Sequence, residues 1–235
     1  MKPILIFTHD QCEPPGYIET LLRRKDIPFH QICLATGEDH GDYSLEDISA
    51  LIFMGGEGDV NQPTEWMQAE MRWIELAQKA DIPVLGICLG AQLMCKAFGG
   101  QVCSDDELEI GWHPLELLSS ARDHPWFNGL PQRFDAFHWH AHSCRPPSSV
   151  EVLASSACTP CQAFVLGRHL GLQFHLEMSP PIIESLIELY ASDLEARSDC
   201  VQSRQQIQES IAQKCDQAFA IADRLLGQWL SALSN

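Results

Sequence analysis

The segment at residues 86–92, Gly-Ile-Cys-Leu-Gly-Ala-Gln, constrains the fold of this 235-residue chain more than any other feature. It follows the apolar residues 82–85 and precedes a stretch of helical character, 93–98, which two glycines end. A strand, a tight turn that carries Cys88 between glycines, and a helix together form the thiol version of a nucleophile elbow. The helix N-terminus then lies beneath the sulfur, where the dipole and the free N–H groups favour the thiolate. The segment predicts a nucleophilic Cys88, although a structural cysteine buried beside a glycine turn gives the same pattern.

A second segment, residues 171–177, reads as a strand that ends in a histidine and a carboxylate. Because side chains alternate along a strand, His175 and Glu177 should point to the same face. A carboxylate in that position orients the imidazole, which can then act as a base on a nucleophile from elsewhere in the chain. A His-x-Glu pair alone is weak evidence, since many such pairs lie on the surface. Together with the elbow, it predicts a triad of Cys88, His175 and Glu177.

Both motifs resemble the signatures of the class I glutamine amidotransferases, which are also called triad glutaminases. Further stretches resemble the free-standing members of this family that are similar to the amidotransferase domain of GMP synthase. These stretches are residues 109–112, 137–140, 153–156 and 162–164, and residues 53–56 resemble the family's glycine loop that supplies an oxyanion-hole amide. An ordered series of motifs is far more specific than either signature alone. The resemblance identifies residues 1–180 as a class I glutamine amidotransferase domain and leaves 181–235 as a C-terminal helical extension packed on it or beside it.

The resemblance also implies a reaction and a site. Cys88 would attack the γ-carboxamide of glutamine and form a thioester with release of ammonia, and His175 and Glu177 would be its catalytic partners. Backbone N–H groups of Gly56 and Leu89 would hold the oxyanion. Contacts with the substrate are implied for Gly55, Gln92, His140, Ala141 and His142. The family has no metal in this pocket, so neither a metal nor a cofactor is expected.

Two positions depart from the family pattern. The family usually has proline between the catalytic histidine and glutamate, where this chain has Leu176; leucine can adopt the same extended backbone, so we expect a looser turn. The related enzymes commonly have His-Gly-Asp where this chain has His-Ala-His at residues 140–142. If the imidazole of His142 points inward, it favours an extra carboxylate or hydrogen-bond acceptor on the substrate. We therefore expect weak hydrolysis of free glutamine by the isolated chain.

Three functions remain open at this stage. The first is a glutaminase or amidotransferase, and the second is a γ-glutamyl peptidase or hydrolase that uses the same triad on a larger γ-glutamyl substrate. The third is a catalytically weak relative that serves as a binding subunit, which the intact triad argues against. The ligand is a small molecule in the first two. The tail is too short to be a synthetase domain, so an ammonia acceptor would lie on a partner chain, or the ammonia would simply be released.

The overall charge limits the partners. With 32 acidic and 15 basic residues, the net charge is −17, which disfavours binding to nucleic acid or to an anionic membrane. No apolar run approaches the ~18 residues needed to span a bilayer. The apolar run at residues 4–7 is very short and is followed by His9 and Asp10, which predicts a buried strand and not a signal peptide. We expect a cytoplasmic protein.

The ten cysteines invite a disulfide or zinc interpretation, which their spacing does not favour. Only Cys158 and Cys161 have the C-x-x-C spacing, and one such pair is weak evidence for a metal or redox site. We expect mostly free thiols of a reducing compartment. His138, His140 and His142 alternate along a strand and could form a metal site. The family resemblance argues against a metal there.

The hydrophobic pattern predicts an α/β fold. Strand-length apolar runs at 4–7, 29–34, 51–54 and 84–87 alternate with helical stretches at 16–25, 66–80 and 89–98. Such alternation predicts three layers, a mostly parallel sheet with helices on both faces, and the resemblance makes this the flavodoxin-like fold of the family. Cys88 then lies beyond the carboxyl ends of the strands, where such folds bind ligands. Short strands in 101–174 should complete the edge of the sheet.

The tail after Met178 is predicted to be helical. Apolar residues recur every three or four positions from Ile207 to Trp229 and form a single stripe on a long helix. The stripe either packs on the protein's own core, which we favour, or forms the seam of a homodimer or partner contact.

Overall fold

The computed structural model describes residues 2–10, 13–39, 41, 43–196 and 198–234. Within these residues, nine strands form one sheet in the order β2-β1-β3-β4-β9-β8-β7-β5-β6. The neighbours that run parallel are β2 (Phe29–Ile32), β1 (Ile4–Phe7), β3 (Ala50–Phe53), β4 (Val84–Ile87) and β9 (His169–Leu172). The strands that continue the sheet with antiparallel pairing are β8 (Ala163–Leu166), β7 (Glu151–Ser156), β5 (Gln101–Leu117) and β6 (Arg133–Arg145).

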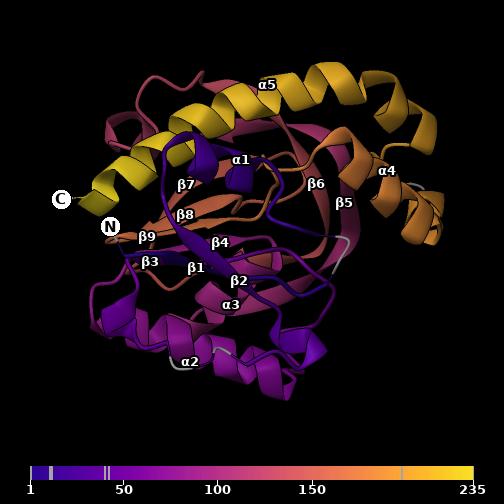
Figure 1. Cartoon of the computed structure of the whole chain (residues 1–235). Helices are drawn as coiled ribbons and strands as arrows, with labels where there is room; N and C mark the ends of the chain where they lie inside the picture. The colour runs from indigo at the N-terminus through magenta and orange to yellow at the C-terminus, as the bar shows by residue number, and fades with distance from the viewer. Residues whose placement is uncertain (1, 11–12, 40, 42, 197, 235) are drawn as a thin grey trace.

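Helices cover both faces of this sheet (Figure 1). The helices are α1 (Tyr17–Arg24), α2 (Glu65–Lys79), α3 (Leu89–Ala97), α4 (Pro180–Leu189) and α5 (Arg204–Ser231). Because side chains alternate along a strand, Ile4 and Ile6 of β1 pack into the layer of α1 and α5, whereas Leu5 and Phe7 pack into the layer of α2 and α3. The three-layer α/β fold predicted from the sequence is confirmed.

The second half of the sheet differs from the sequence expectation. β5 and β6 form one long antiparallel hairpin, where only short strands were expected. β9 ends at Leu172, so the predicted strand that runs on to Glu177 is wrong. Beyond Leu172 the backbone bends, and His175 pairs instead with Phe137 of β6: the His175 N–H donates at 2.9 Å and the Phe137 N–H at 3.3 Å. The edge hairpin therefore positions the second predicted motif.

The C-terminal segment is helical, as predicted. α5 begins with a capping box, in which Ser203 and Gln206 each accept a hydrogen bond from the other's backbone N–H, and it crosses the α1 side of the sheet (Figure 1). The predicted stripe from Ile207 to Trp229 is 0–5% exposed at every position. The stripe packs on the chain's own core, so these residues are not exposed for contact with a second copy of the chain. None of the described helices is long and apolar enough to cross a membrane.

The expectation of free thiols is wrong for Cys158 and Cys200, which form a disulfide. This bond joins the connection between β7 and β8 to the segment that precedes α5. Cys161, the partner that the C-x-x-C spacing suggested, is a buried free thiol. The two bonded cysteines are 42 positions apart, a separation that no local spacing rule identifies.

A substitution of Trp229 measures how much the packing of α5 on the core contributes to stability. The Trp229 side chain is 1% exposed, and its Nε1 donates to the backbone oxygen of Arg168 at 3.3 Å. Trp229→Ala should lower the free energy of unfolding by about 3–5 kcal/mol, because it removes buried apolar contacts and leaves a cavity. Urea unfolding measures the loss, and Leu189→Ala is the control because that side chain is 55% exposed. A loss no larger than that of the control would contradict this account of α5.

Candidate active site

Cys88 lies in the turn between β4 and α3. Its backbone has φ 49° and ψ −104°, a conformation that L-residues avoid and that costs ~1–3 kcal/mol. Two hydrogen bonds hold the turn: the Cys88 N–H donates to Leu172 O at 2.8 Å, and the N–H of residue 90 donates to Met54 O at 3.1 Å. A Cβ on Gly90 would lie 2.1 Å from Phe53 O, so only glycine lets α3 begin this close to β3. The structure thus has the elbow geometry, with Cys88 as the residue that precedes the helix.

His175 and Glu177 are paired in the buried interior. His175 Nδ1 lies 2.6 Å from Glu177 Oε1, and each residue is 1% exposed. The backbone N–H of Leu176 donates to Glu177 Oε2 at 3.0 Å. Leucine therefore supplies a hydrogen bond that the proline usual in the family cannot make. The bend after β9, and not strand alternation, brings the two side chains together.

The surroundings of His175 favour its cationic form. Burial alone lowers the pKa of His175, but the Glu177 carboxylate and hydrogen bonds with Cys88 and Glu177 outweigh burial, and the pKa is raised well above its ordinary value. The sulfur of Cys88 also lies 3.9 Å from the backbone oxygen of Trp139 and 3.6 Å from Gln173 Nε2. The sulfur of Cys88 thus lies beside the imidazole of His175 and at the N-terminus of α3.

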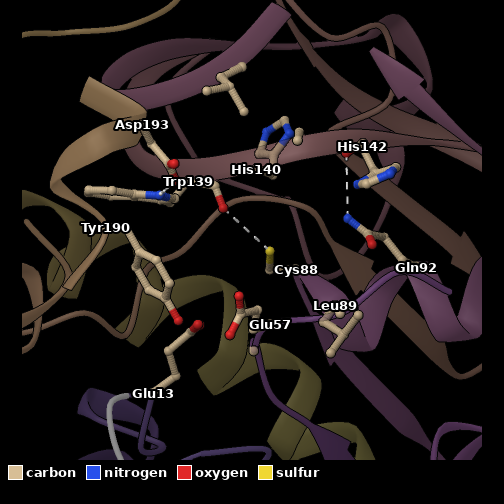
Figure 2. Close-up of a pocket in the computed structure, with 14 residues that line it drawn as sticks. Glu13, Glu57, Cys88, Leu89, Gln92, Trp139, His140, His142, Tyr190 and Asp193 are labelled. Carbon is tan, nitrogen blue, oxygen red and sulfur yellow. Dashed lines mark hydrogen bonds between the residues drawn. The ribbon is translucent and has the colours of Figure 1, made fainter. Parts of the chain in front are cut away.

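A cavity of about 280 Å³ opens beside Cys88 (Figure 2). The described residues that line it are Glu13, Gly56, Glu57, Gly58, Cys88, Leu89, Gln92, Leu108, Trp139, His140, Ala141, His142, Tyr190 and Asp193. Of the oxyanion and substrate positions implied by the resemblance, all except Gly55 are in this set.

The peptide unit between Gly55 and Gly56 is held by His9. His9 Nδ1 lies 2.7 Å from Gly55 O, and His9 Nε2 lies 2.9 Å from Glu70 Oε2. A carbonyl and a carboxylate both accept, so both ring nitrogens donate and His9 is cationic. Burial lowers the pKa of His9, but Glu70 and the Gly55 carbonyl outweigh it and raise the pKa overall. Trp66 stacks on the imidazole with ring centroids 4.9 Å apart.

Fixing the Gly55 carbonyl also fixes the N–H that follows it. In a trans peptide the C=O and the N–H point in opposite directions, so the Gly56 N–H points away from His9. Among the described residues, no hydrogen-bond acceptor is paired with the N–H of Gly56 or of Leu89. Both residues line the cavity. Two unpaired N–H donors beside a nucleophile are what an oxyanion hole requires.

Gln92 and His142 lie on the opposite side of Cys88 from Tyr190 (Figure 2). Gln92 Nε2 donates to the backbone oxygen of His142 at 3.5 Å. The imidazole of His142 has an acidic neighbour, because its Nε2 lies 3.9 Å from the Asp59 carboxylate. His142 also lines the cavity, so its selection of an extra carboxylate on the substrate stays a prediction.

His140 also belongs to a buried cluster with Glu109 and His138. His140 Nε2 and His138 Nδ1 lie 3.3 and 3.9 Å from carboxylate oxygens of Glu109, and one ligand atom from each residue falls within 4.8 Å of the others. Burial raises the pKa of Glu109, but the two histidines lower it overall; burial lowers the pKa of His138 to about 3. Gln162 Nε2 donates to Glu109 at 2.8 Å. Within the part of the chain that the structure describes, these three residues form the group that could hold a metal ion, and His142 does not belong to it.

Comparison with known proteins places the chain in a family. The model of glutamine amidotransferase class I matches residues 18–187. The chain belongs to the class I glutamine amidotransferases. A glutamine-hydrolysing GMP synthase from Thermomicrobium roseum is 34% identical over 172 residues, which are 71% of this chain and 31% of the synthase. The chain therefore spans about a third of that relative's length.

Two further relatives match along most of their own length. A glutamine-hydrolysing GMP synthase subunit from Methanothermobacter thermautotrophicus is 34% identical over 166 residues, covering 68% of this chain and 81% of that protein. The crystal structure of a glutamine amido transferase from Methylobacillus flagellatus superimposes with a TM-score of 0.91 at 27% identity, over 98% of this chain and 95% of that one. The C-terminal helices of this chain thus fall within the superimposed region.

The sequence did not reveal Glu13, Tyr190 and Asp193 as residues of the cavity wall. The rule that ligands collect beyond the carboxyl ends of parallel strands could have indicated Glu13, since it follows β1. No local signal marks Tyr190 or Asp193. They reach the cavity only because the segment after α4 folds back on β6, where Trp139 Nε1 donates to Asp193 Oδ2 at 3.1 Å.

The free thiols should differ in reactivity. Cys88 lines an open cavity at a helix N-terminus, so iodoacetamide should label it before the other cysteines near neutral pH. Burial raises the pKa of Cys161 to about 12 and that of Cys215 to about 11, so these two should stay unlabelled. Peptide mapping after brief treatment measures the order, and Cys88→Ser shows the background. Uniform labelling, or labelling led by the more accessible Cys33, would contradict the elbow interpretation.

Proposed function

We propose that this chain hydrolyses the γ-carboxamide of glutamine or of a γ-glutamyl compound through a thioester on Cys88, and releases ammonia or an amine. The observation that carries the proposal is the arrangement at the elbow: a cysteine at a helix N-terminus faces His175, and Glu177 holds the other ring nitrogen. Membership of a family whose relatives are named for glutamine hydrolysis supports the same reaction.

The first half-reaction forms the thioester. The Cys88 thiolate forms a C–S bond to the γ-carbonyl carbon, and the carbonyl oxygen becomes an oxyanion. The backbone N–H groups of Gly56 and Leu89 hold this oxyanion, a contact worth ~3 kcal/mol per donor in other acyl-transfer enzymes. His175 gives its proton to the departing nitrogen as the C–N bond breaks, so a glutamyl thioester remains.

The second half-reaction hydrolyses the thioester. Neutral His175 takes a proton from a water molecule as the water oxygen attacks the thioester carbon. The C–S bond breaks, Cys88 leaves as a thiolate, and the imidazolium of His175 is restored. Glu177 accepts the Nδ1–H bond throughout, which keeps Nε2 directed at the reacting atoms. Gln92, which begins the second turn of α3, and the backbone of 140–142 contact the glutamyl part.

The fate of the ammonia depends on the partner. One relative is named as a subunit of GMP synthase, and this name supports a partner chain that carries the acceptor site whenever ammonia is transferred. The cycle needs Cys88 as a free thiol, which fits a cytoplasmic protein.

A second candidate, a γ-glutamyl peptidase or hydrolase, has a specific observation in its favour. The cavity continues past Cys88 on the side away from Gln92, where Tyr190 and Asp193 line it (Figure 2). The leaving group of glutamine is only ammonia, so a larger leaving amine would occupy that space. No comparable observation favours a catalytically weak binding subunit.

Glu177→Gln tests the role of the carboxylate. The variant should fold but lose turnover by roughly 10²- to 10⁴-fold, because a neutral amide neither fixes the tautomer of His175 nor stabilises its positive charge. Ammonia release from glutamine, or chromophore release from γ-glutamyl-p-nitroanilide, measures the loss, and circular dichroism checks the fold. Glu75→Gln, at an exposed position of α2, is the matched control. Full turnover by Glu177→Gln would make this glutamate structural and reduce the triad to a dyad.

His9→Phe tests whether the imidazole that holds Gly55 supports the oxyanion site. Phenylalanine keeps a ring for Trp66 to stack on, but it releases the Gly55 carbonyl and leaves Glu70 without its partner. We expect kcat to fall roughly 10- to 100-fold with a smaller change in KM, because the Gly56 donor is needed mainly in the transition state. The control is His30→Phe, an exposed histidine on β2. An unchanged kcat in a folded His9→Phe protein would show that Gly55 needs no such support.

A further inference from the structure

The cavity has two sides, which Cys88 separates (Figure 2). Gln92 lies on one side, at the start of α3. Glu13, which follows β1, lies on the other side together with Tyr190 and Asp193, which follow α4. A substrate whose carbonyl carbon is above the sulfur must place its glutamyl part toward one side and its leaving group toward the other.

The position of His175 identifies the leaving-group side. A general acid has to reach the departing nitrogen. Glu13 and His175 both lie against Gly55. If residue 55 had a Cβ, that atom would lie 2.3 Å from Glu13 Oε2 and 3.0 Å from His175 Cε1. Glu13 is therefore a direct neighbour of the imidazole that supplies the proton. This places the wall of Glu13, Tyr190 and Asp193 on the leaving-group side, and Gln92 on the glutamyl side.

Glu13 is a buried carboxyl group that faces the cavity. It is 9% exposed, and among the described residues no hydrogen-bond donor is paired with its carboxylate. Burial raises the pKa of Glu13 to about 7, although His175 opposes the shift. Burying a carboxylate without donors is unfavourable, and a cation that binds from the cavity relieves this penalty.

The rest of this wall suits a cation as well. Asp193 brings a second carboxylate, which the hydrogen bond from Trp139 Nε1 orients, and Glu57 brings a third from the part of the lining between Glu13 and Leu89 (Figure 2). The rings of Trp139 and Tyr190 lie beside them, 6.2 Å apart. Lysine and arginine are absent from the described lining residues. Carboxylates combined with aromatic faces are suited to bind alkylammonium groups.

We propose that Glu13, Glu57 and Asp193 form a subsite for the leaving amine, and that the preferred substrates are γ-glutamyl amides of amines that carry a second, positively charged group. This inference rests on the proposed function and names its substrate class. His175 protonates the amide nitrogen as the C–N bond breaks, and the product leaves as a diamine whose distal ammonium stays cationic. The methylene chain between the two nitrogens packs along the rings of Trp139 and Tyr190.

The same subsite discriminates against other leaving groups. A leaving amine that ends in a carboxylate would place that group among three acidic side chains, which is unfavourable in a partly enclosed cavity. Free glutamine leaves the subsite empty and therefore obtains no binding energy from it. The subsite thus gives a second structural reason, besides the one expected at His142, for weak hydrolysis of free glutamine by the isolated chain.

Three synthetic γ-glutamyl amides of equal length test the proposal. Their leaving amines carry the same chain of methylene groups and end in a methyl, an ammonium or a carboxylate group. The measured quantity is kcat/KM at pH 8, above the pKa of about 7 that burial gives Glu13. We expect the cationic amide to exceed the neutral one by at least ~10-fold, the ratio that one charge-assisted hydrogen bond provides. The anionic amide should be the poorest.

Variants locate the source of this preference. The readout is the ratio of kcat/KM for the cationic amide to that for the neutral amide, taken within each variant so that a general loss of activity cancels. Glu13→Gln should bring the ratio close to one, and Asp193→Asn should lower it in part. The control is Glu184→Gln, which removes an exposed carboxylate of α4 outside the cavity and should keep the wild-type ratio.

The outcomes separate the two proposals. Similar kcat/KM values for all three amides, or a wild-type ratio in Glu13→Gln, would overturn the subsite and leave the hydrolase intact. If Glu13→Gln is inactive with every amide, the ratio in Asp193→Asn decides, and a wild-type value there also overturns the subsite. If no γ-glutamyl amide is cleaved and Cys88 shows no selective labelling, the proposed function fails and the subsite fails with it.

Discussion

The backbone of Cys88 has a positive φ that a residue with a side chain adopts only under constraint, and the geometry of the whole site depends on it. The constraint comes from two sides, since the ends of β9 and β3 supply the carbonyls that accept hydrogen bonds from the turn. It directs the sulfur toward the cavity and starts α3 directly behind it. Relaxing this turn would move the Cys88 sulfur away from the proposed oxyanion donors and from His175 at the same time.

The parallel and antiparallel halves of the sheet contribute different parts of the site. The parallel half supplies the turn at Cys88, the loop at Gly56 and, through His9, the hydrogen bond that orients this loop. The antiparallel hairpin supplies the backbone pairing between Phe137 and His175. The helices after residue 180 cover the hairpin and bring Tyr190 to the cavity. The proposed catalytic positions thus depend on the sheet, whereas Tyr190 and Asp193 of the proposed leaving-group wall depend on the C-terminal segment.

The sequence predicted those features whose geometry is set by residues close together in the chain, and it missed those that depend on distant segments. The elbow was predictable because strand, glycine turn and helix are contiguous and their geometry is set within a few residues. The pairing of His175 with Glu177 was predicted with the wrong reason, since the strand ends at Leu172 and a bend held by β6 replaces it. The disulfide between Cys158 and Cys200 and the wall at Glu13 were not predicted, because both arise from contacts between segments far apart in the chain.

The central claim, a thioester on Cys88, is tested most directly by trapping that intermediate. Glu177→Gln protein would be mixed with γ-glutamyl-p-nitroanilide, quenched with acid within one turnover and digested for mass spectrometry. The account predicts one glutamyl group on the peptide that contains Cys88, and none when Cys88→Ser protein is treated in the same way. Product formed without any adduct on Cys88, or an adduct on a different residue, would contradict it.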